Sequence, residues 1–223
     1  MKKTFEKNCG IALLIFILLL LITMVLHPAG GNIAYLIRHS KWIIVIHSVA
    51  LLSIPFGWLG FWGFSRKLGI ADFYSMLGFA FLSVTMMAVL FAATANGLVL
   101  PLFLQHYADA AETVIDSALP VVRYNFTVNK AFDYVYTSTY GMAVLCWSVA
   151  ILRSGRLPRW IGITGILLFL TMLFTLLSGL AVNSLQGLRI SMAGFITWSL
   201  IVAISMLQNK AGIEDIYPAQ KAG

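Results

Sequence analysis

Four polar side chains lie in stretches of sequence that are otherwise apolar enough to cross a lipid bilayer: His47, Asn96, Asp133 and Asn183. A polar group costs free energy in hydrocarbon unless it faces other protein groups or water, so such residues are functional candidates. Imidazole, amide and carboxylate groups can bind a polar ligand, relay a proton or coordinate a metal ion.

Asp133 begins a polar row, because Tyr136 and Tyr140 follow it at intervals of three and four residues. Residues at these spacings share one face of an α-helix. The row binds a polar ligand if it faces the protein interior; alternatively, Asp133 forms a surface ion pair with Lys130. We predict a ligand-binding pocket lined by His47, Asn96, Asp133, Tyr136 and Asn183.

A second group, His106, Asp109 and Glu112, recurs at three-residue spacing and could hold a divalent metal ion. The same residues also fit the solvated side of an amphipathic helix. His47 is consistent with a hydrogen-bonded core histidine, a proton relay or a metal ligand. A b-type haem would need His27 or His106 as its second axial ligand. We predict no cofactor, with haem or a divalent metal as the alternative.

Known catalytic signatures are absent from the sequence, which has no GxSxG, Walker, dinucleotide-binding, HExxH or CxxC motif. The net charge of +7 comes from short basic clusters beside apolar runs. Such clusters indicate membrane topology, so we predict no nucleic-acid partner.

The elements that must position these residues are membrane-spanning helices. The chain has 223 residues, of which 60% are hydrophobic and only 10% charged, whereas about a quarter of the residues of a soluble domain are charged. A helix needs about 20 apolar residues to cross the hydrocarbon. Six stretches qualify, namely residues 9–26, 42–64, 73–100, 131–152, 160–182 and 190–207.

The sequence therefore predicts an all-α, polytopic membrane helix bundle with one transmembrane domain, residues 1–209, and a cytoplasmic tail, residues 210–223. With the N-terminus inside, ten of the fifteen Lys and Arg residues lie in cytoplasmic segments. The positive-inside rule then places both termini in the cytoplasm. This topology puts the polar candidates in the outer half of the membrane and predicts a pocket that opens outward.

The long outer loop between the third and fourth spans has a helical pattern of apolar residues from Leu104 to Leu119. We predict an amphipathic helix there, which either lies on the outer surface or extends the third span beyond Pro101.

Tyr140-Gly141 in the fourth span, followed by Ser154-Gly155 and Leu157-Pro158-Arg159, resembles an uncharacterised family of bacterial six-helix integral membrane proteins. The overall length, the long third loop and the short basic fourth loop are also similar to that family. The resemblance implies a prokaryotic, multi-pass protein of the bacterial inner membrane (the plasma membrane). It implies no activity.

For function, we predict a non-enzymatic membrane protein that binds a small molecule or a lipid, or that acts as an accessory or sensory subunit. One alternative is a metal- or haem-dependent enzyme or redox protein that uses His47, His106 and Asp133. The other is a small transporter, although the sequence lacks an inverted repeat. The sequence indicates no oligomeric state.

Overall fold

The structure is a computed structural model that describes residues 2–28, 31–70, 72–179 and 185–208. Within these residues the chain is helical and has no strand. Six helices are long and apolar enough to cross a membrane, which confirms the predicted all-α bundle. The predicted tail, residues 210–223, lies outside the described residues.

The six candidate spans are built from named helices as follows: α1 (Lys2–Leu26), α3 (Ser40–Leu68), the continuous run of α4 (Phe73–Thr94), η1 (Ala95–Val99) and α5 (Leu100–Gln105), α7 (Leu119–Ser154), α8 (Arg159–Leu177) and α10 (Leu185–Leu207). Two short helices, α2 (Ile33–Arg38) and α6 (Glu112–Asp116), lie between them. Residues 9–26, one of the two shortest predicted spans, belong to a helix of 25 residues.

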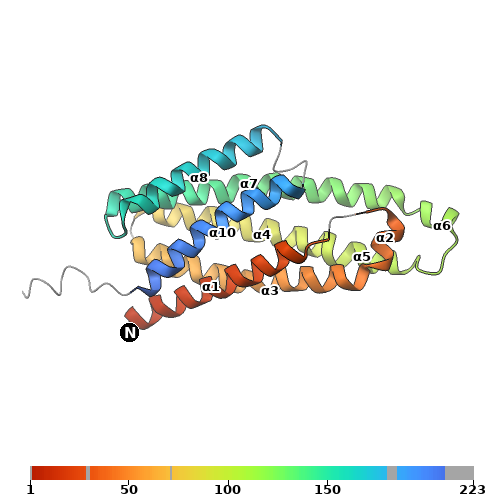
Figure 1. The fold of residues 1–223 in the computed structure, drawn as a ribbon, viewed down its shortest axis with the longest axis horizontal. Helices are drawn as coiled ribbons and strands as arrows, with labels where there is room; N and C mark the ends of the chain where they lie inside the picture. Colours follow the sequence, from red (N-terminus) through yellow and green to blue (C-terminus); the bar gives the residue numbers. More distant parts are fainter. Residues whose placement is uncertain (1, 29–30, 71, 180–184, 209–223) are drawn as a thin grey trace, which may run out of the picture.

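Three of the spans are longer than a bilayer requires. The helix α3 has 29 residues, the run from Phe73 to Gln105 has 33, and α7 has 36. At 1.5 Å per residue, α7 is about 54 Å long, whereas the hydrocarbon is about 30 Å thick. Figure 1 shows these three continuing past the ends of α1, α8 and α10 toward α2 and α6. We call the end of the bundle that carries α2 and α6 the distal end.

The helices α1 and α3 pack closely where Gly57, Gly60 and Gly63 of α3 face α1. A Cβ atom on Gly60 would lie 2.9 Å from the Cα of Leu13, closer than real Cβ atoms approach. Because glycine has no side chain, the two backbones can meet directly, as is common between membrane helices.

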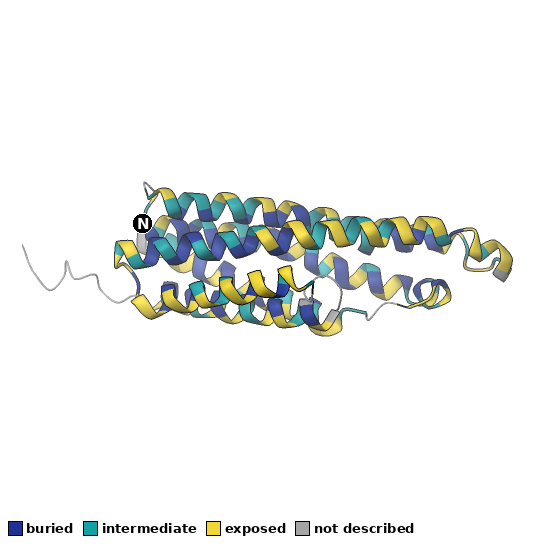
Figure 2. Cartoon of the chain, turned by 90° about the horizontal axis from the view of Figure 1, so that it is seen from above, coloured by how far each residue is buried: buried dark blue, intermediate teal, exposed yellow. Residues whose placement is uncertain are grey.

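The core at the opposite end is centred on Trp147 of α7, which is fully buried. Its ring stacks on Phe61 of α3 with centroids 4.9 Å apart, and its Nε1–H donates to Ser65 Oγ at 2.9 Å. Figure 2 shows buried residues along the inside of the bundle and exposed ones on its outer faces. Many of the exposed side chains are large and apolar, which suits contact with lipid.

The distal loop contains a helix, but it is shorter than the stripe from Leu104 to Leu119 predicts. The helix α5 ends at Gln105, turns follow, and α6 covers only five residues. A new helix, α7, then begins at Leu119. Pro120 has no N–H to donate to the carbonyl of Asp116, and it lies in the first turn of α7, where a helix tolerates proline best.

Candidate functional site

A cavity of about 200 Å³ lies near the distal end, where α1 stops and the three long helices continue. We call it the distal pocket. Its polar lining residues are His27, His47, Asn96 and Asn129. The remaining lining is apolar and comes from Pro28 and from α2, α3, α5 and α7.

His47 is held rigidly on α3 with only 5% of its surface exposed. Its Nδ1 lies 2.8 Å from the carbonyl oxygen of Ile43, one turn earlier. A carbonyl oxygen can only accept a hydrogen bond, so Nδ1 carries the proton. The other ring nitrogen, Nε2, therefore has a free lone pair in the neutral side chain.

His27 has the same arrangement directly after α1. Its Nδ1 lies 2.9 Å from the carbonyl oxygen of Pro28, which leaves Nε2 without a proton. The rings of His27 and His47 are neighbours, with centroids 5.1 Å apart and planes at 60°. Burial, with a smaller effect from the charge of His47, lowers the pKa of His27 to about 4. His27 is therefore neutral at pH 7.

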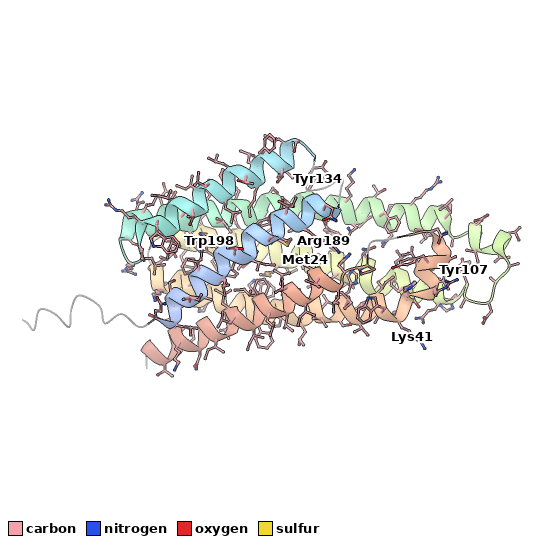
Figure 3. The ribbon with its side chains drawn as sticks, viewed as in Figure 1. Met24, Lys41, Tyr107, Tyr134, Arg189 and Trp198 are labelled. Atoms are coloured by element: carbon pink, nitrogen blue, oxygen red, sulfur yellow. The ribbon has the colours of Figure 1, made fainter. Side chains whose placement is uncertain are left out.

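Arg189, at the start of the last span, forms a hydrogen bond with the backbone of His27. Its Nη2 donates to the carbonyl oxygen of His27 at 3.3 Å, and its Nε is buried without a hydrogen-bond partner in the described part of the chain. Figure 3 shows Arg189 at the distal end of α10, where α1 ends near Met24.

Asn96 reaches the pocket from η1, the π-helical turn between α4 and α5. Its Oδ1 accepts a hydrogen bond from Asn125 Nδ2 of α7 at 3.0 Å. The next residue, Gly97, packs so closely on His47 that a Cβ there would overlap the imidazole ring. Single π-helical turns inside α-helices occur frequently at functional sites, and this one brings Gly97 against the histidine.

Asn129 connects the pocket to the acidic residue of α7. Its Nδ2 donates to Asp133 Oδ2 at 3.3 Å. Among the residues described, no cation lies within ion-pair distance of Asp133. The alternative ion pair between Asp133 and Lys130 is therefore not formed. Tyr136 is buried one turn further along and stacks on Tyr140, with centroids 5.7 Å apart. The row on α7 thus leads from the pocket into the core.

The structure brings together part of the predicted set. His47 and Asn96 line the distal pocket. Asp133 is joined to it through Asn129, and Tyr136 lies in the core beyond the lining residues. Asn183 lies outside the described residues. The convergence of all five residues on one cavity stays a prediction.

Two polar lining residues, His27 and Asn129, are not in the predicted set. Their sequence signals are clear once the pocket is known. His27 precedes a proline at the end of an apolar run, and the helical conformation is disfavoured for a residue before proline, which favours a helix end there. Asn129 is spaced by four residues from both Asn125 and Asp133, so the three share one helix face.

The predicted metal-binding group in the distal loop does not lie on one helix. His106 caps the C-terminus of α5, and Asp109 lies in the following turn. The side chain of Glu112 is outside the described part of the structure. No group of three or more His, Cys, Asp and Glu side chains suited to a metal occurs among the described residues. A metal ion at His106, Asp109 and Glu112 stays a prediction.

Comparison with known proteins returns no relative: no protein-family model, no curated protein and no solved structure matches the chain. The resemblance to bacterial six-helix membrane proteins at Tyr140-Gly141 and Ser154 to Arg159 therefore stays a prediction. What the structure supports is a helical protein with six helices able to cross a membrane.

Proposed function

We propose that the chain is a multi-pass protein of the plasma membrane that binds a small ligand in the distal pocket. The observation that carries this proposal is the pocket itself, in which two imidazole and two amide side chains meet an apolar wall. A largely apolar cavity with a few polar groups is typical of ligand sites between packed helices.

The size of the cavity limits the ligand. At about 200 Å³, it is smaller than the roughly 300–1,000 Å³ of pockets that enclose drug-sized molecules. A haem macrocycle does not fit such a volume, and the contact between His27 and His47 leaves no room for a porphyrin between the rings. A small molecule, an ion or the head of a lipid fits.

The basic residues support an outward-facing pocket. Arg66, Arg153 and Arg159 lie at the ends of α3, α7 and α8 opposite the distal end. The positive-inside rule places that end, with Lys7, in the cytoplasm. The distal pocket then opens on the outer side of the bacterial inner membrane, where a sensory or accessory subunit meets its ligand.

The side chains that line the pocket favour a binding function over a catalytic one. Among the described residues its lining includes imidazole bases but no Ser, Thr, Cys or Lys side chain that a base could activate as a nucleophile.

Native mass spectrometry of the full-length protein in mild detergent tests the proposal. Leu100 of α5 is 4% exposed and lines the pocket, whereas Leu102 is 53% exposed on the same helix. The variant Leu100→Phe fills the pocket, and Leu102→Phe adds the same ring on the outside. We expect a bound mass in the wild type and in Leu102→Phe that is reduced in Leu100→Phe. An adduct equally abundant in all three, or none in any, would reject the proposal.

A further inference from the structure

The two histidines of the distal pocket are held in the way that metal-binding histidines are held. Each ring donates its Nδ1–H to a backbone carbonyl, that of Pro28 for His27 and that of Ile43 for His47. Such a bond fixes the tautomer and the ring, and leaves Nε2 as the ligand atom. Neither Nε2 has a hydrogen-bond partner within the described part of the chain.

The spacing of the two rings fits one ion between them. A metal bound to an imidazole nitrogen at about 2.0–2.1 Å, with a tetrahedral angle between two such ligands, places their ring centroids about 5 Å apart. The observed separation is 5.1 Å.

We propose that His27 and His47 together bind a copper or zinc ion through their Nε2 atoms in the distal pocket. This inference rests on the proposed function, because it names the ligand class of the same site. Neutral imidazole is a preferred ligand of these late first-row metals.

The charge of the groups in and around the pocket indicates which metal ions suit it. The described lining residues include no carboxylate. The carboxylate of Asp133 accepts a hydrogen bond from the lining residue Asn129, and Arg189 adds a positive charge beside His27. Calcium and magnesium ions depend on anionic oxygen ligands, so they do not suit the pocket. A neutral ligand set also compensates a singly charged ion better than a doubly charged one, which favours Cu(I) over Zn(II).

Asn129 can complete the coordination. Its Nδ2 donates to Asp133, its Oδ1 accepts no hydrogen bond from the described residues, and the residue lines the pocket. Asn96 is less suited, because its Oδ1 already accepts a hydrogen bond from Asn125.

Metal titration of the full-length protein in detergent tests the inference, with Cu(I) and Zn(II) each measured against a chromophoric chelator. The variants are His27→Ala and His47→Phe; phenylalanine keeps a ring against Gly97 but has no ligand nitrogen. The other two of the four histidines provide matched controls, His39→Ala and His106→Ala. We expect one equivalent of metal, with Cu(I) bound more tightly, and a loss of affinity of at least about tenfold in the pocket variants only.

X-ray absorption at the copper edge supplies a readout that does not depend on stability. Two imidazole ligands should give the outer-shell scattering of the ring, which falls to one ring in His27→Ala. If neither metal binds, or if all four histidine variants bind alike, the inference is wrong. In that case a bound mass that Leu100→Phe still removes would leave the proposed function standing.

Discussion

The contact between Gly97 and His47 fixes the geometry of the pocket at the level of single residues. Gly97 lies in the π-helical turn, and its missing side chain lets the backbone rest on the imidazole ring. Any side chain at this position would push the ring toward His27 or push η1 away from α3.

We expect Gly97→Ala to lower the free energy of unfolding by about 1–3 kcal/mol, the usual cost of overpacking. Gly141→Ala is the matched control, since its added Cβ would meet nothing closer than 3.6 Å. Both variants replace glycine within a helix, so the difference between them isolates the contact with His47. Denaturant titration in mixed micelles measures it. Equal stability of the two variants would contradict the packing argument.

Single residues of the site were only partly predictable from the sequence. His47 and Asn96 stand out because they are polar groups inside apolar runs, and both line the pocket. Asp133 stands out for the same reason, yet Asn129 lies between it and the pocket. The place of Asn129 depends on the rotation of α7 against its neighbours, which an apolar run does not specify.

At the level of helices, the glycines of α3 set how closely α1 can approach. Gly57, Gly60 and Gly63 recur every three residues in the sequence, a spacing that places small residues along one helix face. The end of α1 leads directly to His27, so this packing also helps to position the pocket.

We expect Gly60→Val to displace α1, because even a Cβ there would lie 2.8 Å from the Cβ of Leu13. The apparent Tm in detergent should fall clearly. Leu59→Val is the control, since Leu59 is 46% exposed on the lipid-facing side and its change should leave the Tm nearly unaltered. A Gly60→Val protein as stable as the control would mean that α1 and α3 are not tightly packed.

The inner contact of α7 with α3 and α4 depends on Trp147. We expect Trp147→Phe to cost about 1–3 kcal/mol, because Ser65 Oγ loses its buried donor. Trp42→Phe serves as the control, since Trp42 is 44% exposed near the start of α3. Denaturant titration compares the two variants. Equal losses would contradict a larger contribution from the buried ring and hydrogen bond of Trp147 than from the exposed ring of Trp42.

For the whole molecule, the six spans were predictable because lipid demands long apolar runs, and each predicted run lies within or overlaps a helix of the structure. The extra length of α7 was not predictable in this way. Its first twelve residues include Arg123, Asn125 and Lys130, so they lack the hydropathy of a span. The part of a helix that extends beyond the hydrocarbon is stabilised by contacts with neighbouring helices. It therefore needs no long apolar run, and hydropathy does not reveal it in the sequence.

The orientation of the whole bundle is tested by cysteine labelling in intact cells. Cys9 and Cys146 are both buried and free, so the background should be low. Ser117 is exposed in the distal loop, and Arg159 is exposed at the opposite end. We expect a membrane-impermeant maleimide to label Ser117→Cys in intact cells and to label Arg159→Cys only after permeabilisation, as the positive-inside rule requires. The reverse pattern would place the distal pocket in the cytoplasm, and His27 and His47 would then meet a ligand supplied from inside the cell.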